Sequence, residues 1–122
     1  MMQQYQWMIY WASLTPSIGS EQAGRRPVLI ISAEEANEFL PVVTIISLTS
    51  MKPGRKLYPT EALLPSTDTG LSQDSIAMAH QIRSISKERL DGTCGRIESE
   101  QLKLEIRKAI TTYLDLTNQS TH

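Results

Sequence analysis

Two arginines stand directly before a proline and an apolar run, in the stretch "AGRRPVLIIS" that ends at Ser32. Pro27 fixes its own backbone torsion and biases Arg26 toward an extended conformation. A guanidinium held in this way presents a rigid fork of donors, which suits a phosphate group. Thr49 closes a second apolar run, "VVTIISLT", and adds a hydroxyl. The spacing alone fits a phosphate site, and it equally fits arginines on a solvated loop edge and a threonine in a turn.

Other catalytic chemistries lack their characteristic residues. His80 and His122 are far apart in the sequence, and no HExxH, paired CxxC or Asp-x-Asp motif is present, so we expect no metal and no cofactor. The stretch "GSEQAG" lacks the lysine of a phosphate-binding loop, and there is no GxSxG elbow, although a Ser-His-Asp triad is not excluded by counting. We expect His80 to be a partly exposed strand residue. Cys94 stands alone and is typical of a small, partly buried apolar residue.

The composition is that of an ordinary globular chain. With 122 residues, 40% of them apolar and 20% charged, the sequence predicts one domain over residues 1–122. The net charge of -1 gives no overall signal for a nucleic acid or a membrane, although a local patch can act inside a neutral total. The start lacks the basic region of a signal peptide, and the apolar runs are too short to span a bilayer. We therefore expect a cytoplasmic protein that does not engage a membrane.

The pattern of apolar and breaking residues predicts a mainly β fold. Strands are expected over residues 5–14, 27–32, 42–48 and 75–86, with short strands at 62–65 and 95–97. The intervening stretches 15–26, 49–61 and 66–74 are predicted to be loops, and Asp91-Gly92 is predicted to be a hairpin turn.

Two helices complete the predicted fold. Ser32 and Glu35 have the spacing of a capping box, which predicts a short inserted helix over 33–40. Ser99 is predicted to cap a C-terminal helix, whose apolar residues recur at three- and four-residue steps and would cover the sheet. Five or six short strands with one terminal helix are typical of a small, half-open barrel.

Five segments occur in the order in which a known family carries them. They are "GSEQAGRRPVLIIS", "VTIISLTS", "YPTEALLP", "GLSQDSIAMAHQIRSISKERL" and "AITTYLDL", and they cover most of the chain from Leu14 to Leu116. The sequence thus resembles the MazF/PemK (Kid) toxins of bacterial toxin–antitoxin systems. The resemblance implies an SH3-like barrel of the CcdB/PemK type and a homodimer. It also implies a sequence-specific, metal-independent endoribonuclease, an mRNA interferase that cuts single-stranded mRNA to 2′,3′-cyclic phosphate and 5′-hydroxyl ends.

The same resemblance implies partners and growth inhibition. RNA and DNA binding are expected, together with a cognate antitoxin whose acidic, disordered segment occupies the RNA groove and folds as it binds. An aromatic start that includes Trp7, Tyr10 and Trp11 is expected to be exposed and is compatible with a dimer interface.

The roles of the site residues are carried over position by position. Arg26 matches the arginine of the family's "RPV" element and would stabilise the phosphoryl oxygens; Thr49 would hydrogen-bond the scissile phosphate. Glu21 would orient Arg26 or assist proton transfer, or else form a loop salt bridge. Ser20 and Gln22 would flank the site, and Gln81 and Arg83 match the family's "QIR" and would contact RNA or support the site. Arg25 is also expected to contact RNA. The charges of Lys52, Arg55 and Lys56 predict a mobile basic patch for the RNA backbone. For the basic cluster in the 49–61 loop, a solvated loop without function fits equally well.

Two alternatives remain open at this stage. A CcdB-like gyrase poison on the same barrel would act through hydrophobic residues at the end of its helix, whereas this chain ends in the polar stretch "TNQSTH". An inactive homologue that only binds partners or regulates transcription would not need Arg26 and Thr49.

Overall fold

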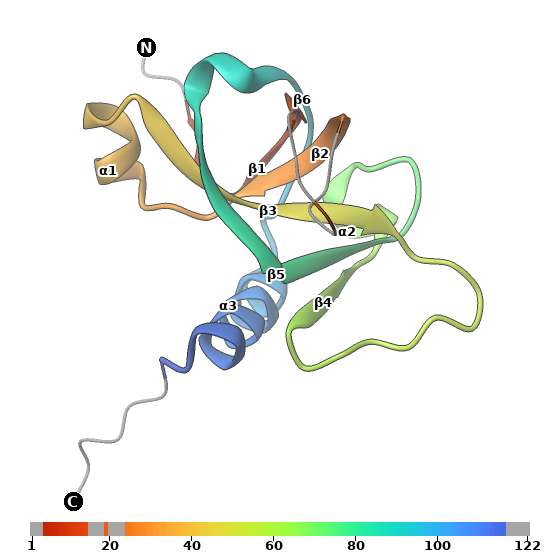
Figure 1. Cartoon of the computed structure of the whole chain (residues 1–122). Coiled ribbons are helices and arrows are strands. Elements are labelled where there is room, and N and C mark those ends of the chain that lie inside the picture. Colours follow the sequence, from red (N-terminus) through yellow and green to blue (C-terminus); the bar gives the residue numbers. More distant parts are fainter. Residues whose placement is uncertain (1–3, 15–18, 20–23, 117–122) are drawn as a thin grey trace, which may run out of the picture.

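The computed structural model describes residues 4–14, 19 and 24–116. Six antiparallel strands form one curved sheet in the order β4-β5-β3-β2-β1-β6 (Figure 1). The strands are β1 (Met8–Ser13), β2 (Arg25–Ile30), β3 (Val42–Ser50), β4 (Glu61–Leu64), β5 (Ser75–Ser86) and β6 (Leu90–Arg96). The helices are α1 (Glu34–Phe39), α2 (Ser66–Thr69) and α3 (Glu100–Leu114), with the 3-10 turn η1 (Lys87–Arg89) before β6. The mainly β prediction is confirmed, whereas strand pairing that closes a barrel is not found among these residues.

Both faces of the central strands are buried. One core cluster includes Ile9, Leu29 and Ile46, and a second includes Val28 and Ile45. Successive side chains of a strand point to opposite faces, so each of these strands contributes to both clusters. This explains why β2 and β3 have continuous apolar runs in place of an alternating pattern.

Helix α3 packs against β4 and β5 on one side of the sheet, as Figure 1 shows. Its predicted cap is confirmed, because the Ser99 hydroxyl accepts a hydrogen bond from the Leu102 N–H at 3.2 Å. Ile106 and Ala109 are buried on its inner face. The helix therefore covers the sheet as the periodicity predicts.

The prediction of an exposed aromatic start is wrong for two of its three members. Trp7 and Tyr10 are only 8% and 4% exposed, because each belongs to a core cluster. The Trp7 ring lies beneath the cations of Lys103 and Arg107 from α3, which approach its centre to 5.7 and 5.1 Å. Trp7 thus attaches α3 to the start of the sheet, and Trp11 alone remains half-exposed.

The inserted helix is confirmed, but its predicted cap is wrong. Ala33 occupies the capping position and makes no side-chain hydrogen bond to the helix. The Ser32 hydroxyl instead donates to Asn37 Oδ1 at 2.6 Å and accepts from the Thr44 N–H at 3.0 Å. Ser32 therefore links α1 to β3. Its hydroxyl is engaged by these two partners and does not cap the helix.

Two further local predictions are wrong. Asp91 and Gly92 do not form a hairpin turn; they lie inside β6, where the pairing with β1 shifts register between Tyr10 and Ala12. Glycine inside a strand often marks such a bulge. The predicted loop 66–74 contains α2, and the long strand over 75–86 is confirmed as β5, with a register shift against β3.

Helix α2 brings the two edges of the sheet together. It follows β4 at one edge, and the carbonyl oxygen of Thr69 lies only 2.7 Å from the point where a Cβ on Gly95 of β6 would stand. Ile9 and Leu71 crowd the same point at 3.3 and 3.4 Å. Only glycine fits at position 95, because the Thr69 carbonyl oxygen occupies the space that a Cβ would need.

Replacing Gly95 by alanine is expected to lower the free energy of unfolding by about 1–3 kcal/mol, because the added methyl overlaps the Thr69 carbonyl. Gly92→Ala is the matched control in the same strand, where a Cβ meets nothing within 4 Å. Its effect should stay within about 0.5 kcal/mol. Urea unfolding measures both, and equal losses in the two variants would contradict the close packing of α2 on β6.

Candidate active site

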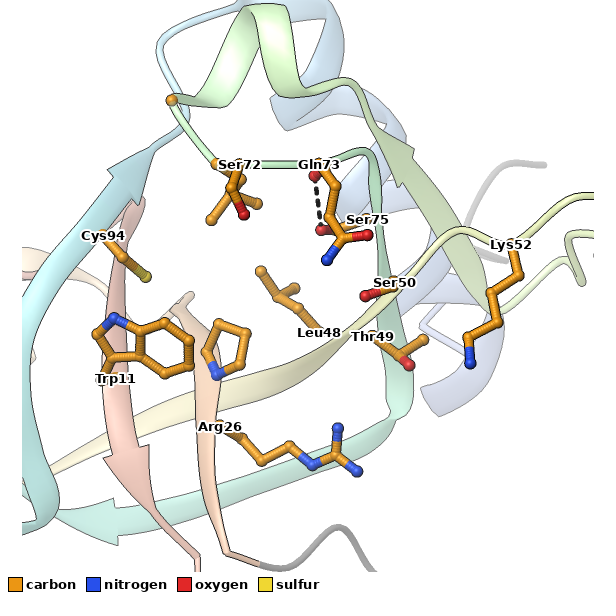
Figure 2. Close-up of a pocket in the computed structure, with 13 residues that line it drawn as sticks. Trp11, Arg26, Leu48, Thr49, Ser50, Lys52, Ser72, Gln73, Ser75 and Cys94 are labelled. Atoms are coloured by element: carbon orange, nitrogen blue, oxygen red, sulfur yellow. Dashed lines mark hydrogen bonds between the residues drawn. The ribbon is translucent and has the colours of Figure 1, made fainter.

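A cavity of about 570 Å³ opens where β2 begins and β3 ends (Figure 2). Its lining comes from five strands, from the loop between β3 and β4 and from the segment after α2. The lining residues are Trp11, Arg26, Pro27, Leu48, Thr49, Ser50, Lys52, Gly70, Leu71, Ser72, Gln73, Ser75 and Cys94. Three of the residues predicted from the sequence, Arg26, Thr49 and Lys52, therefore share one cavity.

The strand register brings Arg26 and Thr49 together. Val28 pairs with Ser47, Leu29 with Ile46 and Ile30 with Ile45. These pairs end at Val28 and Ser47. Both strands run on past them to the cavity, which Arg26 lines from the start of β2 and Thr49 from near the end of β3. Figure 2 shows the Arg26 side chain extending toward the side of the cavity that holds Thr49 and Lys52.

The backbone at Arg26 is also fixed from the other side. In the pairing of β1 with β2, Ala12 lies opposite Arg26 and Trp11 lies opposite Pro27. Arg26 is thus paired with β1, and the following proline restricts its backbone further. The guanidinium is carried on a rigid element, as an electrostatic catalyst requires.

The three basic residues of the β3–β4 loop have different surroundings. Lys52 lines the cavity, whereas Arg55 and Lys56 do not. Arg55 forms an ion pair with Glu61, whose side chain is only 1% exposed, at 2.8 Å. Of the predicted basic cluster, Lys52 therefore lines the same cavity as Thr49, whereas Arg55 is held beside the buried carboxylate of Glu61.

The remaining predicted residues lie around or beyond the cavity. The Arg25 guanidinium lies 4.6 Å from the centre of the Trp11 ring and forms an exposed ion pair with Asp91 at 3.2 Å. Gln81 and Arg83 lie on β5 and do not line the cavity. Ser20, Glu21 and Gln22 lie outside the described residues, so their roles remain predictions.

Sequence reasoning missed the wall opposite Arg26. Trp11 and Cys94 form that wall, and Ser72, Gln73 and Ser75 border the cavity above it (Figure 2). The sequence predicts Trp11 as an exposed residue compatible with a dimer interface, and the 66–74 stretch has only the composition of a loop. The available signal was the resemblance itself, since "GLSQDS" belongs to one of the five matching segments.

Cys94 and His80 lie where the sequence predicts them, one half-buried and the other exposed on a strand. Burial raises the pKa of the Cys94 thiol, and the nearby charge of Arg25 opposes this effect only in part. Cys94 is half-buried, as predicted. His80 is exposed on β5, with its ring 6.5 Å from that of Tyr113, which confirms the prediction of a strand residue.

Two features are absent from the part of the chain that the structure describes. Within 4–14, 19 and 24–116, no group of three or more His, Cys, Asp or Glu residues is arranged to hold a metal ion. No helix in these same ranges has the length and apolar character needed to cross a membrane.

The fold and the site together define a class of bacterial toxin. The family described as PemK-like, MazF-like toxin of type II toxin–antitoxin systems matches residues 5–114, and the chain belongs to this family. It is 37% identical to endoribonuclease MazF9 of Mycobacterium tuberculosis over 113 residues, which are 88% of this chain and 93% of that protein. It is 35% identical to endoribonuclease EndoA of Bacillus subtilis over 94 residues, 77% of this chain and 80% of that one.

A solved structure has the same fold. It is a mycobacterial endoribonuclease in complex with its cognate antitoxin, with a TM-score of 0.76 and 22% identity, covering 95% of this chain and 99% of that one.

The ion pair of Glu61 makes stability depend on pH. Hydrogen bonds from Arg55 lower the pKa of the Glu61 carboxyl below its ordinary 4.5, although burial opposes the shift. A carboxyl with a lowered folded-state pKa stabilises the fold above its unfolded pKa, and this contribution is lost as the pH falls through the folded value. The free energy of unfolding should therefore decline below pH 4.5, and Glu61→Gln should lack that part of the decline.

Urea unfolding between neutral pH and about pH 3 measures the effect. Glu98→Gln is the matched control, because Glu98 forms an exposed ion pair with Arg96. Its curve should run parallel to that of the parent protein. A Glu61→Gln curve that also runs parallel to the parent would contradict the expected contribution of Glu61.

Proposed function

We propose that the endoribonuclease activity of this MazF-family toxin resides at Arg26 and Thr49 and needs no metal ion. The observation that supports the proposal is the shared cavity, which Arg26 lines from the start of β2 and Thr49 from near the end of β3, just beyond the Val28–Ser47 pair. A guanidinium and a hydroxyl are two donors suited to the oxygens of one phosphodiester. The nucleophile is then the substrate's own 2′-hydroxyl, so no metal-bound water is required.

The reaction is a transesterification. The 2′-oxygen forms a bond to the adjacent phosphorus, and the bond from phosphorus to the 5′-oxygen of the next nucleotide breaks. The proton leaves the 2′-hydroxyl and a proton reaches the departing 5′-oxygen, which gives a 2′,3′-cyclic phosphate and a 5′-hydroxyl. Between these steps negative charge gathers on the phosphoryl oxygens, where fixed donors contribute most.

Arg26 supplies the permanent positive charge. An arginine side chain stays protonated in proteins and has only donors, so its role is to stabilise the phosphoryl oxygens and not to accept the proton. Thr49 donates its hydroxyl hydrogen to one of the same oxygens. Glu21 is the group expected to orient Arg26 or to assist proton transfer, in the part of the chain outside the described residues.

The cavity favours single-stranded RNA as the substrate. Lys52 offers a charge to the backbone, and the half-exposed Trp11 ring offers a stacking surface to a base that is not paired. Arg25, Lys56, Gln81 and Arg83 lie outside or at the edge of the cavity and would contact RNA on either side of the cut. Phosphate contacts of this kind make binding weaken as salt increases.

The wider expectations from the sequence form part of the same proposal. The chain acts in the cytoplasm as a single domain over 1–122, as a homodimer with a half-open, SH3-like barrel whose edges meet at α2. A cognate antitoxin inhibits it by laying an acidic segment in the RNA groove. The mycobacterial neighbour solved with its antitoxin supports a partner of this kind.

Arg26→Ala is expected to lower the rate of RNA cleavage by about a hundred- to a thousandfold, the usual effect of losing one fixed electrostatic donor. Thr49→Val, which keeps the side-chain shape and removes the hydroxyl, should lower the same rate. The measurement is cleavage of a long unstructured RNA in EDTA, with the ends mapped for cyclic phosphate.

Arg96→Ala is the matched control, because Arg96 forms an exposed ion pair with Glu98 and does not line the cavity. It should cut at the parent rate. Cleavage by Arg26→Ala at the parent rate would refute the role of Arg26. Activity that is absent in EDTA and restored by magnesium would refute the metal-free mechanism.

A further inference from the structure

The loop between β3 and β4 is held by a buried carboxylate. Glu61, the first residue of β4, accepts hydrogen bonds from Arg55 Nη1 at 2.9 Å and Nη2 at 2.8 Å. It also accepts the Tyr58 N–H at 3.1 Å. The bidentate pairing fixes the direction of the Arg55 guanidinium as well as its distance. Two points of the loop are therefore attached to one buried side chain.

Arg55 is attached in turn to Lys52 through a tight turn. The Arg55 N–H donates to the Lys52 carbonyl oxygen at 3.1 Å, across Pro53 and Gly54. Proline followed by a glycine with φ of +80° is the signature of a type II turn. On the other side, the Met51 N–H donates to the Asp74 carbonyl oxygen at 2.9 Å. The backbone at Lys52 is thus held from both directions.

The burial of Glu61 is better explained by its effect on the conformation of the 51–60 loop than by a gain in the stability of the fold. The Glu61 side chain is 1% exposed and that of Arg55 is 28% exposed. The cost of taking the carboxylate out of water offsets much of its attraction to the guanidinium, so the pair is weak evidence for stabilisation. The pair does, however, restrict a ten-residue loop, residues 51–60, whose only cavity-lining cation among the described residues is Lys52. A lysine has a long flexible side chain, so the position of its ammonium depends on the backbone that carries it.

We propose that Glu61, acting through Arg55, is a positioning residue that holds the Lys52 ammonium at the rim of the cavity for the RNA backbone. The inference rests on the proposed function, since it takes RNA as the ligand. A loop that is ordered before binding loses less conformational entropy when RNA arrives. Glu61 therefore controls the affinity for RNA and leaves the bond-breaking step to Arg26 and Thr49.

The test is a double-mutant cycle on Glu61→Gln and Lys52→Ala. Binding is measured by fluorescence anisotropy of a labelled, fully 2′-O-methylated copy of the unstructured RNA, which cannot be cut. Lys52→Ala should weaken binding about three- to fivefold, the size of an exposed ion contact, and should reduce the salt slope by about 0.7. Glu61→Gln should weaken binding when Lys52 is present and should add nothing when Lys52 is alanine. Additive effects of the two substitutions would overturn the proposal.

A second variant keeps the test independent of the buried site. Gly54→Ala adds a methyl into open space but strains the turn, because the residue has φ of +80°. It should raise the Kd as Glu61→Gln does, and again only when Lys52 is present. Glu98→Gln is the control for the change of charge and should bind as the parent does. If Gly54→Ala and Glu61→Gln both bind like the parent, the loop does not position Lys52 and the proposal fails.

Kinetics separate this inference from the proposed function. With cleavable RNA, Glu61→Gln should raise KM and keep kcat within about twofold, as expected for a loss of binding that is equal in the ground and transition states. A fall in kcat without a rise in KM would overturn the positioning role. Parent-rate cleavage by Arg26→Ala would refute the proposed function instead, whatever the cycle on Glu61 and Lys52 shows.

Discussion

The register of β2 against β3 is the constraint on which the site depends. Because side chains alternate between the faces of a strand, a slip of one residue would move Arg26 and Thr49 to opposite faces. The register cannot slip easily, since both faces of these strands are buried and Val28, Leu29, Ile45 and Ile46 would all exchange environments. The same apolar packing that stabilises the fold therefore keeps Arg26 and Thr49 at one cavity.

Arg26 and Lys52, the two cations that line the cavity among the described residues, are fixed by different means. Arg26 is carried by a central strand between β1 and β3, where backbone pairing and Pro27 define its direction. Lys52 is carried by a loop, and the loop is restrained by the Arg55–Glu61 pair and a type II turn. Fixed charges cost no reorganisation during a reaction, which is the advantage that the proposed role of Arg26 gains from its place on the sheet. A restrained loop is suited to binding, where a small loss of rigidity costs affinity and not rate.

Much of this architecture could be predicted from the sequence, because the signals are local. The runs that form β3 and β5, the Ser99 cap of α3 and the Arg-Pro junction at the start of β2 each depend on neighbouring residues. The errors arise where a distant partner decides the outcome. Ser32 bonds to Thr44 of β3 and does not cap its helix, and Gly92 lies in a bulge because β6 pairs with β1.

The candidate site shows the same division. Arg26, Thr49 and Lys52 could be selected by residue type and by resemblance, and the cavity brings them together. Trp11 and Gln73 could not, because they reach the cavity only through pairing and packing of segments far apart in the chain. Arg55 was predicted from its charge alone as an RNA contact; its bond to Glu61 became visible only with the burial of that carboxylate.

The most direct measurement is a crystal structure of the protein with an RNA whose scissile 2′-hydroxyl is blocked by a methyl group. The account predicts that oxygens of that phosphate lie within hydrogen-bonding distance of the Arg26 guanidinium and the Thr49 hydroxyl, with a neighbouring phosphate near the Lys52 ammonium. An RNA bound with its scissile phosphate on another surface, away from residues 26 and 49, would contradict it.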